Sequence, residues 1–325
     1  MTVIRRLLLV SIGITVALVS AEIGVRLLVP VRTVGPIFSE YHPLYGQSLK
    51  KSFVGRRITP EFTMSFSTNS RGFRGPEVGE LTSRPILCIG DSFTMGYGVS
   101  DGEEFPALLR GMLAERHGSE VIPVVNAGVG AVGNGIWIKF LPREGAELDP
   151  RLVILELCGN DVRDNLREGL FRLSDRGMLI ENPPPHPTRE RRLQRLLEGV
   201  PGFSYSHLAG LMKQVWYLNV TLKRPVVDGG SRRQGLDLTL RIWDEIVRIS
   251  TDHEWPLLVL LVDVEDAHRD RILGFFSDRG IPVAEAPSKE ARPDLYYRID
   301  GHWNPREVLD TIERMEPNPL GDHAG

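Results

Sequence analysis

The sequence has few of the residues that mark several large classes of protein. Its 325 residues include only two cysteines, Cys88 and Cys158, each inside an apolar run typical of a buried strand. We therefore expect two buried free thiols rather than a disulfide. Lys and Arg number 39 against 42 Asp and Glu without a large basic block, so a nucleic-acid binder is not expected. Glycine (33) and proline (23) stay below low-complexity levels, which excludes collagen and global disorder.

The sequence also lacks a cluster of metal ligands with a recognisable spacing. Asp161 directly follows Asn160 and carries a carboxylate, but no second group of His, Cys, Asp or Glu accompanies it. We therefore expect neither a metal ion nor another cofactor.

Residues 1–30 have the composition of a membrane-directed segment. Arg5 and Arg6 precede the uncharged run Leu7 to Ala21, and apolar character continues to Val29. A helix from residue 7 to residue 29 would be about 34 Å long, enough to cross a hydrocarbon core of about 30 Å. Because an N-terminal arginine pair stays in the cytoplasm, we expect a single-pass anchor with the rest of the chain outside. The alternative is a cleaved signal peptide and a secreted protein, since Val19-Ser20-Ala21 resembles a cleavage site.

Beyond residue 30 the sequence predicts an extension, a core and an insertion. Residues 31–84 carry short β-prone stretches without helical periodicity, which indicates a β-rich extension. Residues 85–315 alternate helical patterns with five apolar runs: Ile86 to Ile89, Val121 to Val125, Leu152 to Leu157, Leu257 to Val262 and Ile281 to Ala284. Such runs are typical of a parallel sheet covered on both faces, so we predict a three-layer α/β/α fold with five parallel strands. Residues 163–235 interrupt this alternation as an insertion. The insertion is either a lid or substrate-facing subdomain, or a solvated helical excursion. Residues 316–325 form a tail.

Polar residues follow four of the apolar runs. In an open α/β sheet, ligands bind at the carboxyl ends of the strands. A serine at such a position is also a common helix N-cap, so one block alone indicates little. Together the four blocks contain a nucleophile, a backbone N–H donor, an amide side chain and an Asp/His pair, which are the parts that acyl transfer needs. They are Gly90-Asp91-Ser92, Asn126-Ala127-Gly128, Gly159-Asn160-Asp161 and Asp300-Gly301-His302.

This order of blocks resembles the SGNH/GDSL hydrolase superfamily over about residues 85–312. The resemblance implies the flavodoxin-like fold of that superfamily, with Ser92 as the nucleophile and His302 as the general base. It also implies an oxyanion hole made by the N–H groups of Ser92 and Gly128 and the side chain of Asn160.

The carboxylate of the predicted triad departs from a common family spacing. Many members place the acid three residues before the histidine, where this sequence has Ile299, whereas Asp300 lies two residues before. Some membrane-anchored members and the related alginate and peptidoglycan O-acetyltransferases look similar to the Asp-x-His-Trp form found here. We therefore assign the acid role to Asp300, with Gly301 permitting the tight turn that this requires. The alternatives are Asp294, Asp263 and Glu265.

The predicted function is that of a serine esterase that uses Ser92, His302 and Asp300. We expect it to hydrolyse acyl esters, with acetyl as the expected group, on a carbohydrate or cell-envelope polymer. One alternative is an O-acetyltransferase that passes the acyl group from Ser92 to a polysaccharide hydroxyl. Another is a non-catalytic carbohydrate-binding module. The expected partners are an acylated carbohydrate or small ester and, through the N-terminal helix, the membrane; the sequence does not indicate an oligomeric state.

Overall fold

The chain forms two compact units, each assembled from separate stretches of sequence. The computed structural model describes residues 3–29, 31, 33, 35–79, 83–117, 122–186, 192–193, 196–197, 200, 202–216, 229–264, 266–306 and 308. The first unit comprises Met1–Ile37, Arg56–Thr63 and Thr188–Val226, and the second comprises Phe38–Gly55, Met64–Pro187 and Val227–Gly325. Of the features expected from the sequence, the tail 316–325 and Glu265 lie outside the described residues.

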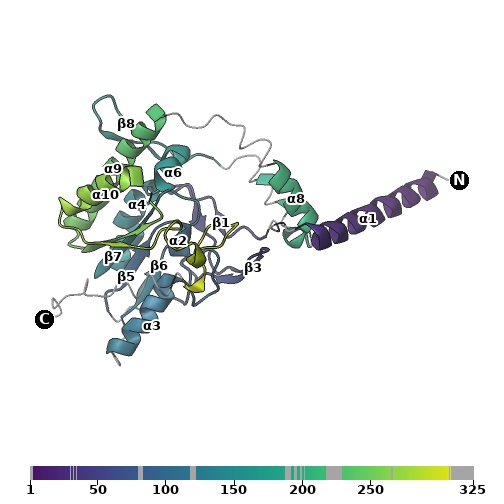
Figure 1. Ribbon diagram of the computed structural model, residues 1–325, viewed down its shortest axis with the longest axis horizontal. Coiled ribbons are helices and arrows are strands. Elements are labelled where there is room, and N and C mark those ends of the chain that lie inside the picture. Colours follow the sequence, from purple (N-terminus) through teal and green to yellow (C-terminus); the bar gives the residue numbers. More distant parts are fainter. Residues whose placement is uncertain are drawn as a thin grey trace. The chain divides into compact units, whose positions relative to one another are not determined.

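A five-stranded sheet in the order β11-β10-β7-β5-β6 is the centre of the second unit (Figure 1). Every pair of neighbouring strands in it is parallel. All residues of β5, β7 and β10 are buried, as a sheet covered on both faces requires. The predicted α/β class and the five parallel strands are therefore confirmed. The strands are β5 (Ile86–Ile89), β6 (Val124–Asn126), β7 (Leu152–Cys158), β10 (Leu257–Val262) and β11 (Val283–Glu285).

Alternate residues of these strands face two different helical layers. Ile86, Ile154 and Leu260 belong to one apolar cluster with Phe105 and Leu113 of α3 (Phe105–His117). The intervening strand residues are also buried. In Figure 1, α3 lies on one side of the strands and α4, α9 and α10 lie on the other. The helices of this second group are α4 (Gly135–Phe140), α9 (Gly229–Asp252) and α10 (Asp266–Ser277).

The strand order reverses its direction at β5, and the carboxyl end of this strand is therefore the switch point of the sheet. Strand β6 follows β5 on one side, whereas β7, β10 and β11 continue on the other side. The direction of winding therefore reverses at β5, and such a switch point is where open α/β sheets bind their ligands. The short helix α2 (Ser92–Met95) begins at this point.

Six further strands of the described residues form two-stranded sheets. Strands β1 (Ser39–Glu40) and β2 (Ser48–Leu49) pair with each other, as do β3 (Val54–Ile58) and β4 (Thr63–Ser67). The predicted insertion contributes β8 (Phe171–Leu173) and β9 (Leu179–Glu181), which form a further antiparallel pair. The remaining short elements of the second unit are η1 (Leu141–Gly145), α5 (Ala146–Leu148), α6 (Asp161–Glu168) and η4 (Pro293–Leu295).

The first unit contains the long apolar helix α1 (Val3–Leu28), the turn η2 (Phe203–Tyr205) and helix α8 (His207–Trp216). No residue of α1 is buried. Among the described residues, α1 is the helix that is long and apolar enough to cross a membrane, judged by its length and composition. Helix α8 lies against the carboxyl-terminal end of α1 (Figure 1).

Both cysteines lie in the central sheet as buried free thiols, as the sequence predicts. Cys88 is on β5 and Cys158 ends β7. Burial raises the pKa of both thiols, so they remain protonated and unreactive at neutral pH.

Candidate active site

Ser92 is the first residue of α2, immediately beyond the carboxyl end of β5. The N-cap of this helix is Asp91, whose Oδ1 accepts a hydrogen bond from the N–H of Phe93 at 2.9 Å. Because the aspartate performs the capping, the serine hydroxyl is available for another partner. A Cβ atom at Gly90 would lie 2.4 Å from the Oε2 of Glu156, so this close turn requires glycine.

Ser92, His302 and Asp300 form one hydrogen-bonded chain. The Oγ of Ser92 lies 2.7 Å from Nε2 of His302. The other ring nitrogen, Nδ1, lies 2.5 Å from Oδ1 of Asp300. The Asp300 side chain is 1% exposed and that of His302 is 23% exposed, so the carboxylate is shielded while the imidazole still reaches solvent. The structure thus brings together the three residues that the sequence analysis assigned to a triad.

The loop that carries His302 and Asp300 folds back on itself. The N–H of Gly301 donates to the carbonyl of Tyr297 at 2.9 Å, and the N–H of Tyr297 donates to the carbonyl of His302 at 2.8 Å. Gly301 has a φ of +86°, in the region that favours glycine. Trp303 is buried against Phe93 of α2 with ring centroids 5.0 Å apart, which fixes the end of the loop in the core.

The alternative carboxylates have other partners. Asp294 accepts two hydrogen bonds from Arg292, each of 3.0 Å. Asp263 accepts a hydrogen bond from the backbone N–H of Lys289. Ile299, at the commoner family position of the acid, is 56% exposed.

The two further donors of the predicted oxyanion hole already have acceptors within the protein. The N–H of Gly128 donates to Oδ1 of Asn126 at 3.1 Å. Asn160 donates through Nδ2 to Asp91 at 3.2 Å and to Asp164 at 2.9 Å. Their roles toward a substrate therefore stay predictions.

Two glycines in the loop after β6 have different surroundings. A Cβ at Gly128 would lie 2.3 Å from the backbone nitrogen of Met95, so Gly128 lets this loop pack directly against α2. A Cβ at Gly130 would lie 3.6 Å from the Cβ of Ser92. Gly130, which the sequence analysis did not single out, is thus next to the serine. Its only signal in the sequence is its place two residues after Gly128 in the same loop.

A buried carboxyl group that the sequence analysis missed supports the start of α2. Oε2 of Glu156 accepts hydrogen bonds from the N–H of Asp91 at 2.9 Å and from Oγ1 of Thr94 at 3.1 Å. Burial, together with the nearby Asp91 and Asp161, raises the pKa of Glu156 well above its usual range. Burial also raises the pKa of Asp91 and of Asp161. The signal in the sequence was a single acidic residue inside the otherwise apolar run of β7.

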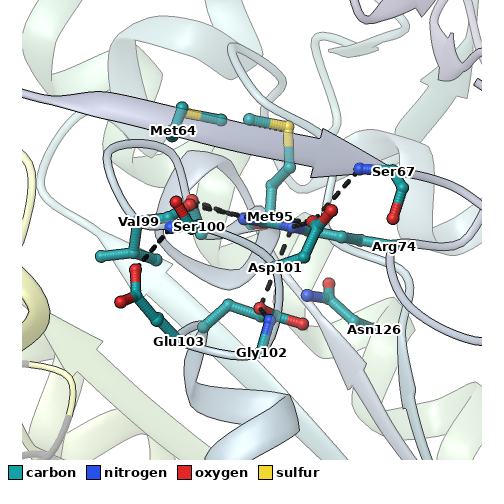
Figure 2. A network of polar contacts seen from close by, with 12 residues as sticks. Met64, Ser67, Arg74, Met95, Val99, Ser100, Asp101, Gly102, Glu103 and Asn126 are labelled. Atoms are coloured by element: carbon teal, nitrogen blue, oxygen red, sulfur yellow. Dashed lines mark hydrogen bonds and ion pairs between the residues drawn. The ribbon is translucent and has the colours of Figure 1, made fainter. Parts of the chain in front are cut away.

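Arg74 supports the other end of α2 (Figure 2). Its guanidinium is fully buried, and Nη1 donates to the carbonyls of Met95 at 2.9 Å and Gly96 at 2.6 Å. Nη2 donates to the carbonyl of Val99 at 2.8 Å, and Nε donates to Oδ1 of Asp101 at 3.1 Å. A positive charge beside the last carbonyls of a helix is favourable. The stretch that follows β4 therefore forms part of the support of α2.

Within the described ranges, no group of three or more His, Cys, Asp or Glu side chains is arranged to hold a metal ion. The groups that the structure brings together at the site are the serine hydroxyl, the imidazole and the Asp300 carboxylate. Such a site can perform nucleophilic acyl transfer.

Comparison with known proteins finds lipases and esterases among the similar proteins. Residues 88–278 match the model of the GDSL-like lipase/acylhydrolase family. An arylesterase of Vibrio mimicus is 30% identical over 121 residues, a stretch that covers 33% of this chain and 60% of that protein. The solved esterase EstA of Pseudoalteromonas sp. is similar with a TM-score of 0.43 and 14% identity, covering 72% of this chain and 94% of EstA. Axe2, an acetylxylan esterase of Geobacillus stearothermophilus, is similar with a TM-score of 0.40 and 12% identity, covering 72% of this chain and 92% of Axe2.

Proposed function

The chain belongs to the GDSL-like lipase/acylhydrolase family, and on that premise we propose that it is a carboxylic ester hydrolase with Ser92 as its nucleophile. The observation that carries the proposal is the hydrogen-bonded chain from Ser92 through His302 to Asp300, with distances of 2.7 and 2.5 Å. The distance between Ser92 and His302 is within the reach that proton transfer to a base needs, and the contact with Asp300 is the hydrogen bond that orients the imidazole.

In the proposed reaction, Oγ of Ser92 attacks the ester carbonyl carbon while Nε2 of His302 takes the hydroxyl proton. The buried Asp300 accepts the Nδ1–H hydrogen bond, which selects the tautomer with a basic Nε2 and stabilises the imidazolium that forms. The imidazolium then gives its proton to the leaving alcohol as the carbon–oxygen bond breaks. A water molecule attacks the acyl-serine with the same base, and this releases the acid and restores the serine.

The oxyanion of the tetrahedral intermediate would need hydrogen-bond donors beside Ser92. We assign this role to the backbone N–H of Ser92 at the start of α2, to Gly128 and to Asn160. Because the Asn160 amide donates to Asp91 and Asp164 in the free protein, it would exchange one of these bonds for the oxyanion. Removing one such donor typically lowers the rate by about 10²–10³.

The proposed substrate is an acyl ester, with acetyl as the favoured group, on a carbohydrate or cell-envelope polymer. Two features support it. The Asp300-Gly301-His302-Trp303 block is similar to that of alginate and peptidoglycan O-acetyltransferases, and α1 would hold the catalytic unit at the outer side of a membrane. The same block leaves an O-acetyltransferase as the second candidate, which differs only in that a sugar hydroxyl replaces water as the final acceptor.

Hydrolysis of p-nitrophenyl acetate and longer-chain esters, with and without sugar acceptors, tests this proposal. Ser92→Ala should abolish p-nitrophenol release, because the variant lacks the attacking hydroxyl. The matched control is Ser277→Ala, at an exposed position in the last turn of α10. Full activity of Ser92→Ala would contradict the serine mechanism. Acceleration by a sugar with formation of its ester would favour the transferase.

A further inference from the structure

Helix α8, within the predicted insertion, is joined to the N-terminal helix through the carboxylate of Glu22. Oε2 of Glu22 accepts hydrogen bonds from Oγ of Ser206 at 2.8 Å and from the N–H of Leu208 at 2.9 Å. Oε1 accepts one from the N–H of His207 at 2.8 Å. Arg26, one turn further along α1, lies 3.7 Å from the same carboxylate. A carboxylate with several donors at the first turn of a helix is a strong and directional attachment.

The position of Glu22 on α1 sets the depth of this attachment in a bilayer. Arg6 and Glu22 are about 24 Å apart along a helix that rises about 1.5 Å per residue. This is somewhat less than a hydrocarbon core of about 30 Å. If Arg6 is at the inner boundary of the core, Glu22 lies at or just below the outer boundary. Helix α8 begins at the level of Glu22 and so starts where lipid headgroups meet acyl chains.

The surface of α8 suits that location. Leu208, Leu211, Met212 and Val215 recur at helical spacing and form an apolar stripe. Met212 is 66% exposed and Val215 is 48% exposed, although both are large apolar side chains. Gln214 is a polar and exposed residue two positions after Met212, so it lies about 160° around the helix from Met212.

We propose that α8 is an interfacial helix whose apolar stripe (Leu208, Leu211, Met212 and Val215) binds the lipid surface beside α1, held there by Glu22. The inference rests on the proposed membrane anchoring of α1, because the depth of Glu22 follows from it. An amphipathic helix that lies in the interface buries its apolar side at the headgroup boundary. The part of the insertion that contains α8 would then attach the enzyme to the membrane.

Fluorescence of a polarity-sensitive label tests this in the full-length protein. Single cysteines are introduced by Met212→Cys, by Gln214→Cys as the control on the same helix, and by Ile12→Cys within α1. The native Cys88 and Cys158 are buried, so labelling is confined to the new residues. The labelled proteins are reconstituted in phosphatidylcholine–phosphatidylglycerol vesicles whose lipids carry a nitroxide quencher near the glycerol end of the acyl chain.

The expected result is a blue-shifted, strongly quenched label at position 212 and an unshifted, weakly quenched label at position 214. Glu22→Gln should reduce the quenching at 212 while α1 stays in the membrane. A label quenched at position 12 but not at 212 would overturn the role of α8 and leave the anchor intact. Absence of quenching at both positions would overturn the anchor as well. Equal quenching at positions 212 and 214 would also contradict the proposal. So would a label at 212 that is blue-shifted but not quenched, which is the result expected if this side of α8 packs against a second copy of the chain.

Discussion

Replacing Asp300 by asparagine tests the least expected assignment of the proposed triad. The side chain is 1% exposed and its Oδ1 lies 2.5 Å from the imidazole Nδ1. Asparagine has nearly the same shape, but its amide can donate to Nδ1 and thereby favours the tautomer that carries the proton on Nε2. That proton occupies the lone pair that must accept the proton of Ser92.

The expected size of the effect follows from the role of this hydrogen bond. Loss of the correct tautomer with unchanged geometry lowers kcat by about 10⁴ in serine-histidine-aspartate enzymes. This corresponds to about 5.5 kcal/mol of transition-state stabilisation at about 1.36 kcal/mol for each factor of ten. KM should change little, because Asp300 contacts the far side of the imidazole and is not expected to contact the substrate.

The assay is steady-state hydrolysis of p-nitrophenyl acetate by Asp300→Asn, with Asp294→Asn and Asp263→Asn as matched controls. Asp294 is paired with Arg292 and Asp263 with the backbone of Lys289, so both controls should keep near-normal kcat. Retention of most activity by Asp300→Asn, with loss in one of the controls, would refute the assignment of the acid.

Three further predictions concern the support of α2 and the oxyanion. Because the pKa of Glu156 is raised above its usual value of 4.5, the folded state binds its proton more tightly than the unfolded state. Its contribution to stability is therefore complete below about pH 4.5 and is lost as pH rises toward the folded-state pKa. The free energy of unfolding, measured with denaturant at a series of pH values, should fall more steeply with rising pH in the wild type than in Glu156→Gln. An equal pH dependence in the two proteins would contradict this prediction. Arg74→Met should lower the free energy of unfolding by about 3–5 kcal/mol, because it leaves the buried Glu104 and the partly buried Asp101 without their cation; a change near zero in urea titration would contradict it. Asn160→Ala should lower kcat by about 10²–10³, and unchanged kcat would remove Asn160 from the oxyanion hole.

Much of the candidate site could be predicted because three of its four blocks lie at the carboxyl ends of strands β5, β6 and β7. The runs of β5 and β10 are unbroken apolar segments, the run of β7 is interrupted only by Glu156, and parallel strands bring their carboxyl ends to one edge. Asp300 and His302 are separated by a single glycine, so local backbone geometry decides their contact.

The supporting contacts could not be predicted, since they join segments far apart in the sequence. Arg74 contacts carbonyls more than twenty residues away, and an arginine in a polar stretch gives no sign that it will be buried. Glu156 accepts a hydrogen bond from the N–H of Asp91, which is 65 residues away in the sequence. The grouping of α8 with α1 depends on Glu22 and Ser206, which are 184 residues apart. Apolar periodicity does not encode such pairs.

The most direct measurement of the central claim is the site of covalent labelling by a fluorophosphonate. The probe reacts with a serine hydroxyl that an adjacent base activates and forms a stable phosphonyl ester in place of the acyl-enzyme. Peptide mapping by mass spectrometry should find the added mass on Ser92 alone, with loss of ester hydrolysis in proportion to labelling. Labelling of another serine, or full hydrolytic activity with Ser92 completely modified, would contradict the account.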